Sequence, residues 1–182
     1  MPNPAFTIDA ARWAAAPSID AYIDGAHKNQ EFWRNARRLA RVDDAMVARL
    51  SAAPGPWRLL ALSEDWCSDA MSTLPAIARL VERAGNAELR VLARDEHPDL
   101  MDAHLTGSTR SIPVVMVLDN ALVERGWWGP RPAPLHAWLR SEGLGLEPKE
   151  RSRRKREWYA RDRGATTVSE LVALVERVGA GQ

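Results

Sequence analysis

The spacing of apolar residues predicts helices at both ends of the chain and alternating strands and helices between them. In residues 1–52, apolar side chains recur at intervals of three and four, which is typical of helices that bury one face. Three helices are expected there: one capped by Ser18, a second around residues 32–40 and a third after Asp43. The apolar face predicted for the second helix consists of Phe32, Ala36, Leu39 and Ala40. Proline and glycine at positions 54–56 end this pattern.

Residues 53–143 alternate between strand and helix patterns. A short apolar run over 57–63 predicts a strand, and a helical period over 69–84, closed by Gly85, predicts a helix. The remaining elements are a strand at 88–94, a helix from Pro98 to Gly107, strands at 114–118 and 122–127, and a helix ended by Gly143. The order β-α-β-α-β-β-α makes the first two strands parallel and the last two an antiparallel hairpin. We therefore expect an α/β fold with a four-stranded mixed sheet.

The last zone, residues 144–182, is predicted to form two helices. The first, over 147–163, is highly charged, and the second has a candidate capping box of Thr167 and Glu170 followed by an apolar stripe. The stripe consists of Val168, Leu171, Val172, Val175 and Val178. We therefore interpret residues 1–52 and 144–182 as helical extensions of a central α/β domain.

The composition is that of an ordinary globular protein. The chain has 182 residues, of which 46% are hydrophobic and 27% charged. A net charge of +1 excludes strong electrostatic binding to nucleic acids or membranes by the chain as a whole. No apolar run approaches the roughly 18 residues that cross a bilayer, and residues 1–16 lack the basic-then-apolar order of a secretory signal. We expect a cytoplasmic protein that does not bind membranes.

The charged helix predicted over residues 147–163 has two interpretations. Its lysines and arginines would neutralise phosphates without reading bases if they contacted nucleic acid. Acidic residues are interleaved with them, and we favour a helix that faces solvent or a protein partner. Trp158 and Tyr159 are expected to anchor this helix to the rest of the protein.

Cys67 is the only cysteine, so one chain cannot form an internal disulfide or a cysteine-based metal cluster. The histidines lack the spacing of metal ligands, and we expect no metal site. Cys67 lies where the first predicted strand passes into a helix, and the N-terminus of a helix favours the thiolate. The carboxylates of Glu64, Asp65 and Asp69 oppose this effect, because nearby negative charge raises the pKa of a thiol.

Two segments near Cys67 carry a family resemblance. The first is Glu64-Asp-Trp-Cys-Ser-Asp-Ala70, with Pro75 eight residues after the cysteine, and the second is Arg110-Ser-Ile-Pro113 before a β-branched run. Together with the strand order, these segments resemble the thioredoxin family. The resemblance implies a thioredoxin-like fold in which Pro75 lies within the active-site helix and Pro113 is a cis-proline beside Cys67.

The same resemblance implies roles for the residues around the sulfur. Trp66 would flank it, and Ile112 and Pro113 would present their backbone to an extended peptide or thiol substrate. Arg110 is expected to approach the thiol as a further substrate contact. Asp69 would either accept a proton or cap the helix, and we favour capping.

The match is closest to a bacterial branch of the family whose active-site segment reads Trp-Cys-Gly-Asp-Ala. That branch also has a segment similar to Trp128-Gly-Pro-Arg-Pro132. Trp127 and Trp128 would line a substrate groove, or one of them would pack in the core and the other be partly exposed. Two family residues are absent. The second cysteine of a dithiol site would fall at Ala70, and the buried carboxylate would fall at Ala61.

A single-cysteine thiol–disulfide oxidoreductase in cell redox homeostasis is our first functional hypothesis. Its mixed disulfide at Cys67 must be resolved by an external thiol, so the expected partners are a disulfide- or thiol-containing protein and a small thiol, with no other cofactor. This hypothesis predicts that Cys67 alkylates at neutral pH faster than a free thiol. The alternative is an inactive thioredoxin-fold module that binds a protein partner through the groove near Pro113. A third possibility is dimerisation through Cys67.

Overall fold

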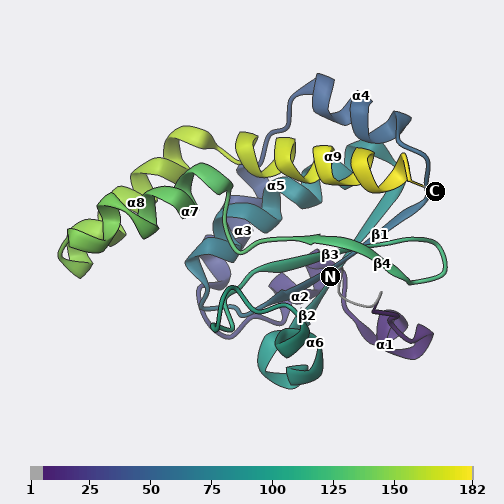
Figure 1. Cartoon of the computed structure of the whole chain (residues 1–182), viewed down its shortest axis with the longest axis horizontal. Helices are drawn as coiled ribbons and strands as arrows, with labels where there is room; N and C mark the ends of the chain where they lie inside the picture. Colours follow the sequence, from purple (N-terminus) through teal and green to yellow (C-terminus); the bar gives the residue numbers. More distant parts are fainter. Residues whose placement is uncertain (1–5, 182) are drawn as a thin grey trace.

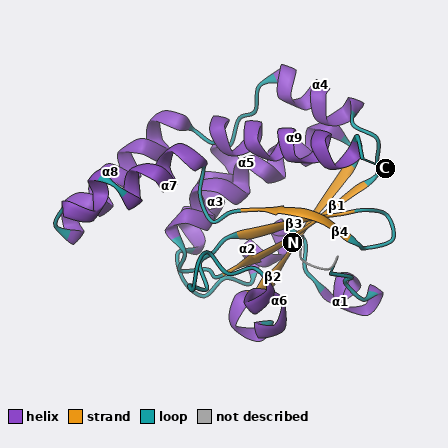
Figure 2. Ribbon diagram, viewed as in Figure 1, coloured by secondary structure: helices purple, strands orange, loops and turns teal. Residues whose placement is uncertain are grey.

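The computed structural model describes residues 6–181, so the first five residues of the expected N-terminal extension and the last residue of the C-terminal one lie outside it. Its four strands are β1 (Trp57–Ser63), β2 (Ala87–Ala93), β3 (Val114–Leu118) and β4 (Glu124–Trp128). They form one sheet in the order β2-β1-β3-β4 (Figure 2). β1 is parallel to β2 and antiparallel to β3, and β3 is antiparallel to β4. The predicted α/β class, the mixed sheet and the hairpin are confirmed.

Helices cover both faces of this sheet. They are α1 (Ala10–Ala15), α2 (Ile19–Asp24), α3 (Gln30–Leu39), α4 (Asp44–Ala52), α5 (Ser68–Ala84), α6 (Pro98–Ala103), α7 (Ala133–Arg140), α8 (Pro148–Asp162) and α9 (Ala165–Gly179), with short 3-10 helices η1 (Arg94–Glu96) and η2 (Glu142–Gly145). Figure 1 shows α4, α5 and α9 along one face and α1 and α6 on the other, with α7 and α8 extending beyond the sheet. The helical extensions predicted at both ends of the chain are therefore present.

Several boundaries differ from those expected. The sequence pattern did not indicate α1, whose N-cap Asp9 accepts a hydrogen bond from the Arg12 N–H. α6 ends at Ala103, and Gly107, expected to end it, lies in the turn that follows. The capping box predicted at Thr167 is wrong, because α9 begins at Ala165 and Thr167 is buried within it.

The N-terminal helices share the core of the sheet. Trp33 of α3 is fully buried, and its indole N–H donates to the Asp65 carbonyl oxygen at 3.0 Å. The face predicted for α3 was therefore wrong: Phe32 is 71% exposed and Leu39 57% exposed, while the tryptophan beside Phe32 fills the core. The sequence period alone did not distinguish the two faces, because a helix with apolar residues on both sides can bury either.

Candidate functional site

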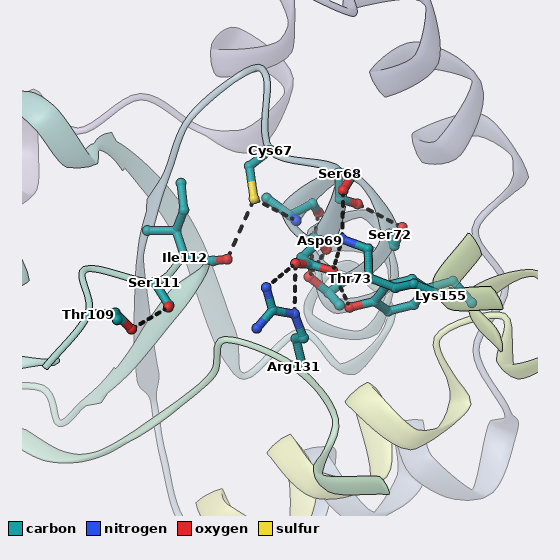
Figure 3. Close-up of polar contacts among 12 residues, drawn as sticks. Cys67, Ser68, Asp69, Ser72, Thr73, Thr109, Ser111, Ile112, Arg131 and Lys155 are labelled. Carbon is teal, nitrogen blue, oxygen red and sulfur yellow. Dashed lines mark hydrogen bonds and ion pairs between the residues drawn. The ribbon is translucent and has the colours of Figure 1, made fainter. Parts of the chain in front are cut away.

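Cys67 lies at the junction that the sequence indicated, directly before α5. It is the N-cap of this helix, and its Sγ accepts a hydrogen bond from the Ala70 N–H at 3.5 Å. On its other side the Cys67 thiol donates to the Ile112 carbonyl oxygen, also at 3.5 Å. Figure 3 shows the sulfur between this carbonyl and the first turn of α5. The thiol thus connects the first turn of α5 to the segment that leads into β3.

The segment before β3 has the backbone form that the resemblance implied. The Ile112–Pro113 peptide bond is cis, and both residues are buried. Gly129, in the loop after β4, lies against the Pro113 carbonyl so closely that a Cβ there would be 2.1 Å from the carbonyl oxygen. The fold therefore brings Cys67, Ile112 and Pro113 together from segments that are far apart in the sequence.

Burial dominates the acidity of Cys67. The residue is only 7% exposed, and this burial raises the pKa of its thiol above the ordinary range for cysteine. Asp69 raises the pKa further, while hydrogen bonds from the Ala70 and Asp69 N–H groups and the charge of Lys155 act in the opposite direction. This direction argues against the fast alkylation at neutral pH that the first hypothesis predicts, because a raised pKa leaves less of the thiol ionised there than in a free cysteine.

Only one of the three nearby carboxylates raises the pKa of the thiol. Asp65 points away and accepts hydrogen bonds from the His27 and Lys28 N–H groups at 2.9 and 2.8 Å. Glu64 accepts from the Asp95 N–H at 2.9 Å. Asp69 is therefore the acidic residue that matters for the thiol, although all three are close to it in sequence.

Asp69 is the centre of a buried polar network. The residue is 3% exposed, and its carboxylate accepts hydrogen bonds from Arg131 Nε at 2.8 Å and the Tyr159 hydroxyl at 3.0 Å. Lys155 Nζ lies 3.1 Å from the same carboxylate (Figure 3). The favoured capping role of Asp69 is thus wrong, since the Cys67 side chain occupies the N-cap position and Asp69 binds distant residues instead.

The partners of Asp69 were not among the site residues inferred from the sequence. Arg131 comes from the loop after β4, and Lys155 and Tyr159 lie four residues apart on one face of α8. Tyr159 is buried, as expected for an anchor of this helix. Burial and the neighbouring Asp69 carboxylate hold the pKa of Tyr159 well above its usual range, so the hydroxyl stays a donor. The one available signal was Arg131 itself, within the Trp128-Gly-Pro-Arg-Pro132 segment.

Two other predicted site residues, Trp66 and Arg110, are held by partners other than the thiol. Trp66 is 45% exposed beside Cys67, and the Arg94 guanidinium lies 5.1 Å from its ring centroid. Arg110 does not approach the thiol; its exposed guanidinium forms a two-point ion pair with Asp102 at 2.6 and 2.7 Å.

Trp128 does not line an open groove. It is 7% exposed, and its indole N–H donates to the Glu170 carboxylate at 2.8 Å. The same carboxylate accepts a hydrogen bond from the Ala133 N–H at 2.8 Å, at the start of α7. Trp128 and Glu170 therefore join β4 and α7 to α9.

Replacing Asp69 with asparagine should make Cys67 more reactive. The change keeps the size of the side chain but removes the negative charge that raises the thiol pKa, and it leaves the charges of Arg131 and Lys155 uncompensated. We expect the rate of iodoacetamide alkylation at neutral pH to rise several-fold, because each unit of pKa is a tenfold change in ionisation. The Glu64→Gln variant is the matched control and should alkylate at the wild-type rate. Equal rates for Asp69→Asn and wild type would show that Asp69 does not act on the thiol.

The described residues contain no candidate metal site and no candidate membrane-spanning helix. Within residues 6–181, no group of three or more histidine, cysteine, aspartate or glutamate side chains has an arrangement that could hold a metal ion. No helix in this part of the chain combines the length and apolar character that a membrane crossing requires.

Comparisons with known proteins agree with this architecture. A family model described as thioredoxin matches residues 16–144, which includes much of the segment expected to be an N-terminal extension. A crystal structure of a protein of unknown function from Pseudomonas aeruginosa is 21% identical, with a TM-score of 0.71 over 93% of this chain and 98% of that one. An HIV epitope scaffold is 20% identical, with a TM-score of 0.69 over the same shares. No curated protein matches the chain. At these identities the two structures support the fold.

Proposed function

Because this chain belongs to the thioredoxin family, we propose that it carries out thiol–disulfide exchange through Cys67 alone. The observation that supports this proposal is the position of the sulfur. It lies at the N-terminus of α5, 3.5 Å from the Ile112 carbonyl oxygen and beside the cis-proline Pro113. An extended substrate that pairs with the Ile112 backbone would bring a disulfide next to this sulfur.

The proposed reaction has two exchange steps. Cys67 loses its proton to solvent, and the thiolate attacks one sulfur of a substrate disulfide. A Cys67–substrate disulfide forms, the substrate disulfide breaks, and the second substrate sulfur leaves as a thiolate that is protonated by water. A low-molecular-weight thiol, as its thiolate, then attacks the substrate sulfur of the mixed disulfide. This step forms a disulfide between the small thiol and the substrate and releases the Cys67 thiolate.

An external thiol is needed because no residue of the chain can resolve the mixed disulfide. Ala70 occupies the position of a second cysteine, and its backbone N–H donates to Cys67 Sγ. Small thiols are abundant in reducing compartments, where cysteines remain unpaired. The proposal therefore places the reaction in the cytoplasm.

The raised thiol pKa sets the pH dependence of this reaction. Only the thiolate attacks, so its fraction increases with pH until the pH passes the thiol pKa. We expect exchange to be slow at neutral pH and to keep accelerating at alkaline pH values where a free cysteine has already reached its limiting rate.

Intact-mass measurement after acid quenching tests the proposal. The folded protein is incubated with oxidised glutathione, and we expect one glutathione adduct that reduced glutathione removes. The Cys67→Ser variant should form none, and adduct formation should accelerate with pH. If the folded wild-type chain formed no adduct at any pH at which it stays folded, while the urea-unfolded chain did, the exchange function would be excluded.

Burial of the thiol favours a second candidate function. A cysteine that is 7% exposed, with a raised pKa and hydrogen bonds on two sides, can also be a structural residue in a protein-binding module. In that case Cys67→Ser would bind a protein partner as the wild type does. Loss of partner binding in Cys67→Ser, with the fold unchanged by circular dichroism, would instead favour a role through the sulfur.

A further inference from the structure

A groove between α3, α5 and α8 has no role in the proposed exchange reaction. It encloses about 610 Å³, which lies in the range of small-molecule sites, roughly 300–1,000 Å³. Its lining is mainly apolar: Leu39 and Ala40 come from the end of α3, Met71 and Pro75 from α5, and Ala160 from α8. The groove therefore has the size and the lining of a site for an apolar group.

The apolar wall on α3 is the face that the sequence pattern assigned to the core. Trp33 fills the core instead, which leaves Ala36, Leu39 and Ala40 along the groove. Leu39 is 57% exposed. A large exposed leucine in a concave apolar surface is where a hydrocarbon group would gain the most by excluding water.

Positive charge borders this apolar lining. Arg41, Arg156 and Arg163 all line the groove. Within residues 6–181, Arg156 and Arg163 have no carboxylate at ion-pair distance. By contrast, Arg153 and Arg154 of the same helix are both paired with Glu150. The Arg41 guanidinium donates to the Arg38 and Ala40 carbonyl oxygens. These acceptors are neutral, so they do not balance its positive charge as a carboxylate would.

We propose that this groove binds a small amphipathic anion with a single hydrocarbon chain, such as a fatty acid. The chain would lie against Leu39, Met71 and Pro75, and the anionic head would be held by Arg156 and Arg163. Guanidinium groups bind carboxylates and phosphates through paired hydrogen bonds, so either head group suits these arginines. A ligand with both features matches the apolar lining and the uncompensated charge together, which a neutral lipid or a simple anion does not.

Isothermal titration calorimetry with laurate, below its micelle concentration, tests this proposal. We expect saturable binding of one laurate per chain. Dodecanol, which has the same chain without the charge, should bind at least tenfold more weakly, measured by competition with laurate. Monododecyl phosphate distinguishes the head groups: tighter binding than laurate would assign the site to a phosphate, and weaker binding to a carboxylate.

Variants locate the binding site. In Arg156→Gln/Arg163→Asn both charges are removed, and asparagine is chosen at position 163 because φ is +53° there and asparagine tolerates left-handed backbone. We expect at least a tenfold loss of laurate affinity. The matched control, Lys149→Gln/Arg161→Gln, removes the same charge from the same helix outside the groove and should bind like the wild type. Ala160→Trp fills the groove from an exposed position and should abolish binding.

Three outcomes would overturn the proposal. They are the absence of saturable laurate binding, equal losses in the two double variants, and unchanged binding in Ala160→Trp. Binding of an acidic amphipathic peptide by a protein that does not bind laurate would assign the groove to a protein partner instead. Cys67→Ser should bind laurate like the wild type, so this result is independent of the thiol exchange reaction.

Discussion

Replacing Trp33 with alanine should reduce the free energy of unfolding by about 3–5 kcal/mol, the usual cost of removing a buried tryptophan. Trp33 is fully buried, packs edge-on against Tyr22 with ring centroids 5.6 Å apart and donates to the Asp65 carbonyl oxygen. The substitution therefore leaves a cavity next to the Cys67 loop, and the Asp65 carbonyl oxygen keeps only its longer hydrogen bond from the Asn29 side-chain amide at 3.3 Å. Urea unfolding followed by circular dichroism measures the loss, which is a large part of the stability of a typical domain.

Phe32→Ala is the matched control for Trp33→Ala. It removes an aromatic side chain from the adjacent position of the same helix, but Phe32 is 71% exposed and should contribute less than about 0.5 kcal/mol. Similar losses for the two variants would mean that α3 is not attached to the core through Trp33. The N-terminal helices would then be an independent extension, rather than part of the core that supports the site.

A Gly129→Ala substitution should be the most damaging small change near the candidate site. The added Cβ would lie 2.1 Å from the Pro113 carbonyl oxygen, and the backbone at Gly129 has a φ of +138°, which side chains rarely adopt. Steric overlap and backbone strain each cost about 1–3 kcal/mol, so we expect a loss of stability of about 3 kcal/mol or more. A displaced Pro113 would also separate the Ile112 carbonyl from Cys67, and alkylation of the thiol should become faster in the variant.

Gly107→Ala separates the two causes of this effect. Gly107 also has a positive φ, +62°, but a Cβ there would meet no atom within 4 Å. It should therefore show only the backbone cost, about 1 kcal/mol. Thermal unfolding of both variants and iodoacetamide alkylation below the transition give the comparison. If Gly129→Ala lost no more stability than Gly107→Ala, the close contact with Pro113 would not be a constraint on the site.

The sheet and its connections were predictable because they follow from local patterns. β3 is a continuous apolar run and β1 is a nearly continuous one, as expected for strands covered on both faces, and their observed bounds agree with those predicted. The bounds of α5 were also predictable, since its helical period begins just after Cys67 and ends at Gly85. The cis-proline came from the family resemblance, and no local pattern would have indicated it.

The environment of the sulfur was not predictable from neighbouring residues. Glu64, Asp65 and Asp69 all lie within three residues of Cys67 in the sequence, but only Asp69 acts on the thiol, because the other two bind distant backbone N–H groups. The role expected of Arg110 fails for a similar reason, since Asp102 holds its guanidinium away from the site. Which charges surround a buried group depends on side-chain partners that lie far away along the chain.

The sequence by itself determined the strand order, the single thiol at the start of a helix and the absence of a resolving cysteine. These features depend on local hydrophobic period, on composition and on residues a few positions apart. Only the tertiary structure decided that Trp33 rather than Phe32 enters the core, that the thiol is buried, and that Arg131, Lys155 and Tyr159 meet at Asp69. The physical reason is that burial and electrostatic environment arise from packing between distant segments, which no local pattern specifies.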